Sequence, residues 1–212
     1  MPLPEVTFHS MNFTVGHWFP RADYEAIDFN PPYQRGTVWT IDQRRALIKS
    51  FLMGLPIGAV VVSVLPYELT PEHYHYRIID GKQRLETVRL FEADGFTIPV
   101  EWLPEESWQY GNDAPTEGDV VLSQAPYVRR IFEMSRAFPA LEWHGAKEQT
   151  GWAEVPKRGY TDQFQRVPVW RERTNAELLR AEAEVFMLLN GGGTGQDPEH
   201  MAEVAKMAAG EE

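Results

Sequence analysis

The chain has 212 residues, 43% of them hydrophobic and 24% charged, which suits one globular domain with a substantial core. The absence of cysteine excludes disulfides, thiol nucleophiles and thiolate metal sites, and the net charge of −11 argues against tight non-specific binding to nucleic acid. No apolar run approaches the length of a membrane span and no signal peptide is visible, so we expect a cytoplasmic protein that does not bind membranes.

Strands and helices interleave irregularly along the chain. Strands are indicated by β-branched runs or period-two alternation, and helices by apolar residues three or four positions apart. In chain order we expect a short strand or bend at 24–29, a loop at 29–39, a helix at 40–53, strands at 60–65 and 73–79, a helix at 82–94, a strand at 96–102, a helix at 123–136, a strand at 164–170, and helices at 174–190 and 197–208. Two helix starts have the spacing of capping boxes, Thr40 with Gln43 and Thr174 with Glu177.

The irregular order of elements predicts an α+β fold, with a small mixed sheet and flanking helices. We expect a single domain over residues 1–212. Residues 137–163 have weak periodicity, and the whole segment 103–163 is interpreted as a variable insertion. In the helix at 174–190, the apolar stripe includes Leu178, Ala181, Val185 and Leu189, with Phe186 beside it.

The segment RIIDGKQRLETVRLF, residues 77–91, joins a strand to a helix through a tight turn. A helix N-terminus exposes unpaired N–H groups and a partial positive charge. Lys82 and Arg84 add cations to the first turn, where they oppose the helix dipole, and this favours a bound anion such as phosphate. A capping box formed by Asp80 and Gln83 is the alternative interpretation, and the two can hold together.

Three polar stretches adjoin glycines at the ends of elements, at residues 33–35, 80–84 and 190–194. Arginine presents a rigid fork that matches phosphate oxygens, and glycine lets backbone N–H groups approach an anion. Asp80 could hold a divalent cation or accept a proton. Trp39, close to the first stretch, is the tryptophan best placed to stack on a base. If the stretches converge, they provide the positioning and charge neutralisation that phosphoryl chemistry requires.

These stretches and their order resemble a known family. The resemblance is carried by Tyr33-Gln34-Arg35 with Trp39, by LIKSFLMGLPIG, by IIDGKQRLETVRLF, and by Leu189-Asn190 with Gly192-Gly193-Thr194. Together they resemble the DGQQR-motif domains at the N-terminus of GmrSD-type modification-dependent restriction enzymes and related phage-defence proteins, within the ParB/sulfiredoxin-like superfamily. The resemblance covers residues 24–102 well and 164–208 more loosely.

The resemblance implies a ParB/sulfiredoxin-like domain that binds a nucleoside triphosphate and, with Mg²⁺, hydrolyses it or transfers its phosphoryl group. The family's signature residues match Asp80, Gly81, Gln83 and Arg84, its upstream polar pair matches Gln34 and Arg35, and its C-terminal loop matches Asn190, Gly192, Gly193 and Thr194. We expect Asp80, Gln83 and Arg84 to be catalytic, with Asp80 as metal ligand or base. Lys82 replaces the usual glutamine and would contact phosphate, while Gln34 and Asn190 would orient water, nucleotide or a modified base.

Two other functions stay open on the sequence. Restriction members of the family carry an HNH nuclease domain, ParB proteins a helix-turn-helix reader and sulfiredoxins a cysteine, and none of these is visible in the 212 residues. The chain could be a non-catalytic module that binds a nucleotide, modified DNA or, through residues 103–163, a partner protein. It could also be a DNA kinase or nuclease acting alone, with DNA binding that weakens steeply with salt.

Overall fold

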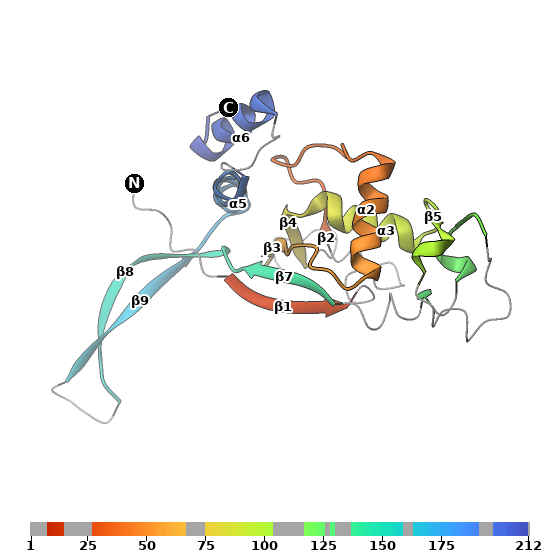
Figure 1. Cartoon of the computed structure of the whole chain (residues 1–212). Helices are drawn as coiled ribbons and strands as arrows, with labels where there is room; N and C mark the ends of the chain where they lie inside the picture. The colour runs from red at the N-terminus through yellow and green to blue at the C-terminus, as the bar shows by residue number, and fades with distance from the viewer. Residues whose placement is uncertain are drawn as a thin grey trace.

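The computed structural model describes residues 8–14, 27–66, 75–103, 117–125, 128–129, 137–158, 163–190 and 197–211 (Figure 1). A mixed sheet forms its centre, with the strand order β1–β7–β3–β4–β2. These strands are β1 (Phe8–Thr14), β2 (Ile27–Asp28), β3 (Val60–Val64), β4 (Tyr76–Asp80) and β7 (Ala137–Trp143). Strand β3 is parallel to β7 and antiparallel to β4, β2 is parallel to β4, and β1 is antiparallel to β7.

The helices of the described ranges are α2 (Ile41–Leu52), α3 (Lys82–Glu92), α5 (Asn175–Asn190) and α6 (Pro198–Ala209). Both expected capping boxes form: Thr40 Oγ1 accepts from the Gln43 N–H at 3.3 Å, and Thr174 Oγ1 accepts from the Glu177 N–H at 3.3 Å. The mixture of a sheet with these helices confirms the α+β class. In the part of the chain that the structure describes, no helix has both the length and the apolar composition to cross a bilayer.

The two central strands are buried on both faces, which explains their nearly unbroken apolar sequences. Val60, Val62 and Ile78 belong to a core shared with α2 and α3. Val61 and Ile79 belong to a second core shared with α5 and α6. Each fully buried side chain of this type stabilises the fold by ~1.5–3 kcal/mol relative to exposure. Helices on both sides of the sheet therefore hold the end of β4 firmly in place.

Strand β7 lies inside the segment 103–163 that the sequence assigns to an insertion. It pairs with β1 on one side and with β3 on the other, so residues 137–143 belong to the main sheet. The insertion assignment is therefore wrong for this strand, whose short pattern is interrupted by Pro139. For the rest of 103–163, a variable insertion stays a prediction.

The remaining strands form two small sheets. Strand β5 (Ile98–Pro99) pairs with β6 (Asp119–Val120), and β8 (Lys147–Pro156) pairs antiparallel with β9 (Phe164–Glu172). Figure 1 shows the β8–β9 pair extending away from the body of the protein as a long ribbon, which we name the arm. The strand predicted at 164–170 is thus confirmed, with a partner that the sequence did not indicate.

Two expectations about regular structure are wrong. The strand expected at 96–102 is limited to β5, after which Val100–Trp102 form a 3₁₀ turn, because Pro99 has no N–H with which to continue a ladder. On α5, Leu189 is 43% exposed, and the buried residues are Leu178, Glu182, Ala183, Val185 and Phe186. The start of the strands expected at 24–29 and 73–79, and most of the helix expected at 123–136, lie outside the described residues.

Candidate functional site

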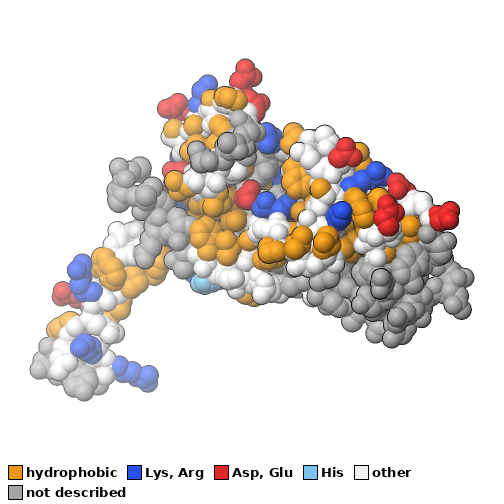
Figure 2. Space-filling model, in the orientation of Figure 1, with side chains coloured by type: hydrophobic (Ala, Val, Ile, Leu, Met, Phe, Trp, Pro, Cys, Tyr) orange, Lys and Arg blue, Asp and Glu red, His pale blue; other side chains and the backbone are white. Residues whose placement is uncertain are grey.

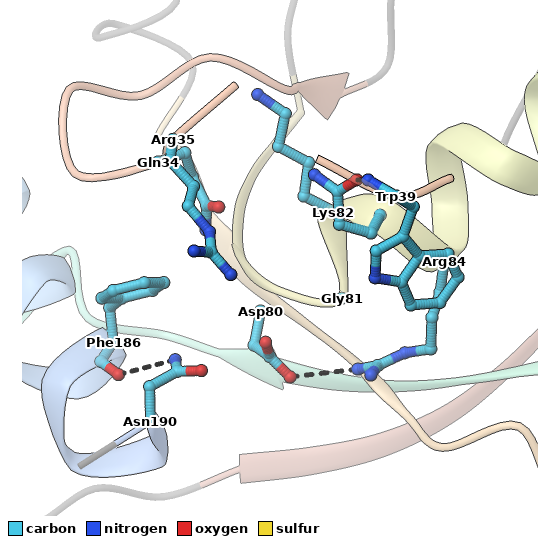
Figure 3. Close-up of a pocket in the computed structure, with 10 residues that line it drawn as sticks. Gln34, Arg35, Trp39, Asp80, Gly81, Lys82, Arg84, Phe186 and Asn190 are labelled. Atoms are coloured by element: carbon cyan, nitrogen blue, oxygen red, sulfur yellow. Dashed lines mark hydrogen bonds and ion pairs between the residues drawn. The ribbon is translucent and has the colours of Figure 1, made fainter. Parts of the chain in front are cut away.

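A pocket of about 280 Å³ opens where β4 ends, α3 begins and α5 ends (Figure 3). Its walls come from three distant parts of the chain. The lining residues are Gln34, Arg35, Trp39, Asp80, Gly81, Lys82, Gln83, Arg84, Phe186 and Asn190. All of these except Phe186 are candidates from the sequence. The three polar stretches therefore converge in space, as far as they are described.

Gly81 makes the turn between β4 and α3 and is also the N-cap of the helix. Its φ of +88° lies in the left-handed region, which favours glycine. A Cβ here would lie 2.9 Å from Arg84 Nη2 and 3.2 Å from Val60 Cα, so space also requires glycine. The expected capping box of Asp80 and Gln83 is wrong, because the N-cap is a glycine and no side chain caps α3. Among the described residues, no side chain accepts from the first N–H groups of this helix, which lie beside the pocket.

Arg84 and Asp80 form an ion pair on the pocket wall, with 3.0 Å between Arg84 Nη2 and Asp80 Oδ2. Arg84 Nη2 also donates to the Ala59 carbonyl at 2.7 Å. The Asp80 side chain is 34% exposed, and its Oδ1 takes part in no hydrogen bond within the described ranges. Arg84 Nη1 likewise has no partner among the described residues. The pair therefore fixes the two groups and still leaves Asp80 Oδ1 and Arg84 Nη1 available, while the buried Arg84 Nε also has no partner among the described residues.

The two other cations expected to face phosphate point in different directions. The Arg35 guanidinium points into the pocket towards Asp80 (Figure 3), and within the described part of the chain it forms no hydrogen bond or ion pair. The Lys82 ammonium donates to Asn30 Oδ1 at 3.0 Å and lies 3.8 Å from Glu86 Oε1. The Lys82 side chain is only 5% exposed. Its charge is satisfied inside the protein, so the geometry provides Arg35 and not Lys82 as a free cation.

Gln34 is used to anchor the loop that carries Arg35. Its Nε2 donates to the Ile79 carbonyl at 2.6 Å, which ties residues 33–39 to strand β4 immediately before Asp80. A side-chain amide in this bond cannot orient a ligand with the same N–H group. Gln34 therefore acts as a positioning residue in this structure.

Gln83 of the D-G-x-Q-R motif has a similar role from the opposite side. Its Oε1 accepts from the N–H groups of Val38 and Trp39 at 3.2 Å each, and its Nε2 donates to the Gly36 carbonyl at 3.3 Å. These three bonds hold the loop against the first turn of α3. Gln83 thereby sets the positions of Arg35 and Trp39, and three of the four hydrogen-bonding positions of its amide are occupied by backbone groups.

Phe186 and Asn190 form the far wall, on the last turns of α5. Asn190 Nδ2 donates to the Phe186 carbonyl at 2.9 Å, which holds the amide at the end of the helix (Figure 3). Gly192, Gly193 and Thr194, expected to form a phosphate-binding loop, lie outside the described residues. Asn190 is therefore the last described residue of this wall.

Behind the pocket, a buried ion pair joins α5 to β4. Arg77 Nη1 lies 2.9 Å from Glu182 Oε2, and the two side chains are 8% and 0% exposed. The Tyr33 hydroxyl donates to the Ile78 carbonyl at 3.1 Å and also lies 3.3 Å from Glu182 Oε2. Arg77 Nε lies 3.3 Å from Asp28 Oδ2. This network connects the loop, the strand and the helix that together form the pocket.

Burial controls the protonation of this network. It raises the pKa of Glu182, with the Arg77 guanidinium acting in the opposite direction, and it raises the pKa of Tyr33, to which the Glu182 carboxylate adds. Burial lowers the pKa of Arg77, but the Glu182 carboxylate outweighs it and the pKa is raised overall. Sequence reasoning missed this network. The available signal was Glu182 itself, a carboxylate four residues from both Leu178 and Phe186 in an apolar stripe, where it requires a buried partner.

The side chains of the pocket can be compared with the ligands that a bound metal ion requires. No group of three or more His, Cys, Asp or Glu side chains able to hold a metal ion occurs among the described residues. Mg²⁺ does not require one, because it is commonly held by one or two carboxylates together with substrate phosphates and water. Asp80, with Oδ1 free of hydrogen bonds in the described ranges, fits such a shared site.

A family model described as "GmrSD restriction endonuclease, N-terminal domain" matches residues 19–149, which is more than half of the chain. The match includes the loop 33–39 and the motif at 80–84, whereas Phe186 and Asn190 lie beyond it. Comparisons with curated proteins and with solved structures find no significant match.

Proposed function

The chain belongs to the family of GmrSD restriction endonuclease N-terminal domains, and we propose that its pocket binds the phosphates of a nucleoside triphosphate and promotes Mg²⁺-assisted phosphoryl transfer, most simply hydrolysis. The family match confirms the resemblance inferred from the D-G-x-Q-R motif. One observation carries the functional proposal: Arg35, Arg84 and the uncapped start of α3 meet in one pocket beside Asp80. The Arg35 guanidinium, Arg84 Nη1 and the first N–H groups of α3 have no side-chain partner among the described residues, and such donors favour a bound anion.

The size of the pocket favours the polyphosphate end of the ligand. Its volume of about 280 Å³ is just below the range of ~300–1,000 Å³ that encloses drug-sized molecules. A triphosphate fits this space, and the nucleoside would extend past the rim. The Trp39 ring on the wall (Figure 3) provides an aromatic surface on which a base could stack.

The roles follow from the atoms that remain available. Arg35 and Arg84 would neutralise phosphate oxygens, and guanidinium forks do so bidentately. Asp80 would hold Mg²⁺ through Oδ1, and a bound Mg²⁺ supplies charge neutralisation at the phosphates. Gln34 and Gln83 would act indirectly, because their amides bind backbone groups.

The proposal is tested by phosphate release from ATP and GTP in the presence of Mg²⁺. The variants Asp80→Asn and Arg84→Gln should each lower turnover by about a hundredfold, the usual effect of removing one group that stabilises developing charge. Arg35→Gln should weaken nucleotide binding by roughly tenfold to a hundredfold, since a hydrogen bond to a charged group contributes ~1.5–3 kcal/mol. Circular dichroism and thermal melting check that each variant is folded.

A second ion pair in the same protein provides the control. Arg45 Nη2 lies 2.8 Å from Asp119 Oδ2, away from the pocket. Arg45→Gln and Asp119→Asn make the same charge changes as the test variants and should leave turnover unchanged. Full turnover in both pocket variants, or an equal loss in the controls, would remove the support for this assignment.

A specific observation also favours a non-catalytic nucleotide-binding module. Asp80 Oδ2 is held in an ion pair with Arg84 at 3.0 Å, so one of the two carboxylate oxygens is already engaged. Gln34 Nε2 and Gln83 Oε1, which could have oriented a water molecule, are already bonded to the backbone. Calorimetry with a non-hydrolysable triphosphate separates the two functions: binding with no phosphate release from the natural nucleotide identifies the module.

A further inference from the structure

The arm formed by β8 and β9 has one face covered with exposed aromatic side chains. Trp152 pairs across the ribbon with Pro168, and Phe164 pairs with Pro156. Since side chains alternate along a strand, residues 164, 168 and 170 share this face with Trp152. Trp152, Phe164 and Trp170 are each 56% exposed. Most of the arm lies beyond the residues that match the family, so the family does not explain this face.

The basic residues of the arm differ in how they are paired. At its base, Arg171 pairs with Glu148 and Glu177, and Lys147 lies 3.5 Å from Glu172. Farther out, Lys157 and Arg158 form no ion pair, and Arg166 stacks over the Trp152 ring at 5.4 Å; these statements apply to the described residues. Figure 2 shows Lys and Arg side chains standing out from the arm among hydrophobic ones. The outer half of the arm therefore combines aromatic rings with three cations, Lys157, Arg158 and Arg166, against one described carboxylate on the same face, Glu154, which lies opposite Arg166 in the ladder.

We propose that the aromatic face of the arm binds single-stranded nucleic acid. Trp152, Trp170 and Phe164 would stack on bases, and Lys157, Arg158 and Arg166 would contact phosphates. From Trp170 to Phe164 the strand spans about 20 Å, enough for several nucleotides at ~3.4 Å per stacked base. A single strand fits better than a duplex, because the faces of paired bases are covered by their neighbours. The inference does not depend on the proposed function of the pocket.

The acidic net charge of the chain does not prevent this contact. The ten residues of β8 extend the arm by ~33 Å. Exposed charges are largely screened beyond ~8 Å at physiological ionic strength. The carboxylates of the body therefore have little effect at the outer half of the arm. There, the charges of the arm itself determine whether phosphates are attracted.

A second copy of the chain is a less suitable occupant. Aromatic side chains bury ~150–250 Å² each, so the exposed fractions of the three rings amount to about 350 Å². A stable interface needs ~800 Å² from each partner. The face is too small for a stable dimer but sufficient for base stacking.

Fluorescence anisotropy of a labelled oligothymidylate of about 15 nucleotides tests the proposal with the full chain. The double variant Trp152→Ala/Trp170→Ala should weaken binding at least tenfold. The matched control is Val169→Ala, which changes a 41% exposed side chain on the opposite face of the same ribbon and should bind as the unchanged protein does. The logarithm of the binding constant should fall with the logarithm of salt concentration with a slope of about −2, as expected for three phosphate contacts.

Several results would overturn the proposal. They are the absence of binding to the unchanged protein, retention of binding in the double variant, and a loss in Val169→Ala as large as in the double variant. A duplex of the same length that binds as tightly as the single strand would contradict base stacking. A dimer that forms at micromolar concentration and is abolished by the double variant would assign the face to a second copy. Phosphate release from nucleotide is measured separately, so failure here leaves the pocket assignment untouched.

Discussion

Replacing Gly81 with alanine tests the central geometry of the site, and Gly58 offers a matched comparison. Both glycines have positive φ, +88° and +79°, and for both the nearest side chain is that of Arg84. A Cβ at Gly58 would lie 3.7 Å from the Arg84 guanidinium, an ordinary contact. A Cβ at Gly81 would lie 2.9 Å from Arg84 Nη2, so the guanidinium must move. The two variants thus share the backbone penalty and differ in what happens to Arg84 and in the tight contact with Val60, 3.2 Å from its Cα, that only Gly81→Ala makes.

The expected magnitudes follow from this difference. A left-handed alanine costs ~1–2 kcal/mol, offset by ~0.4–1 kcal/mol because alanine restricts the unfolded chain, so Gly58→Ala should cost about 1 kcal/mol. Gly81→Ala additionally displaces Arg84 from Asp80 and from the Ala59 carbonyl. For partly exposed charged groups this adds about 2 kcal/mol, giving about 3 kcal/mol in total.

Thermal and urea unfolding measure the effect. For a domain of this size ~1 kcal/mol lowers Tm by ~2–4 °C, so Gly81→Ala should lower it by about 6–12 °C and Gly58→Ala by about 2–4 °C. Gly81→Ala should also lose nucleotide binding, because Arg84 has left its place on the pocket wall. If the two variants destabilise the protein equally, within about 0.5 kcal/mol, Arg84 relaxes without cost and the reasoning is refuted.

Three further predictions concern single side chains on α5 and α3. Glu182→Ala should destabilise the protein by ~3–5 kcal/mol in urea unfolding, because it leaves Arg77 buried without its closest carboxylate, and a cost below about 1 kcal/mol would show that the pair is unimportant. The hydrogen bond from Arg171 lowers the pKa of Glu177 from 4.5 to about 2. The ionised carboxylate therefore stabilises the folded state above pH 4.5, and this contribution is lost as the pH falls from 4.5 through about 2. In Glu177→Gln, the part of the pH dependence of stability that arises between these two pH values should disappear. Gln83→Ala should release the loop that carries Arg35, because the hydrogen bonds to Val38 and Trp39 are lost. Trypsin cleavage after Arg35 should then be faster, roughly fivefold for each ~1 kcal/mol of lost hydrogen bonding. An unchanged cleavage rate would contradict the role of Gln83.

Features set by nearby residues could be predicted from the sequence. The capping box of Thr40 and Gln43 and the stretch Asp80 to Arg84 are local patterns, and the structure places both at helix starts. The error at Asp80 is also local: the left-handed turn at Gly81 moves the cap by one residue. The same motif residue, Gln83, was assigned to catalysis because a sequence does not show that its amide meets the backbone of a loop more than 40 residues away.

Features set by distant residues could not be predicted in this way. The pair of Arg77 and Glu182 joins positions 105 residues apart, and neither residue has a local pattern that names its partner. Strand β7 was assigned to an insertion because its pairing with β1 and β3 depends on the whole sheet. The convergence of the three polar stretches was a hypothesis until the fold placed them together, although the residue types at each were recognisable.

The long separation between Arg77 and Glu182 has a consequence for the order in which the domain assembles. Contacts between distant positions form late, because the intervening loop must close before they contribute. The wall carrying Phe186 and Asn190 is therefore expected to dock after β3 and β4 have paired, because that pairing joins much closer positions. A ligand that touches both walls binds only the docked state, so its presence would oppose the detachment of α5 and slow hydrogen exchange there in proportion to its concentration.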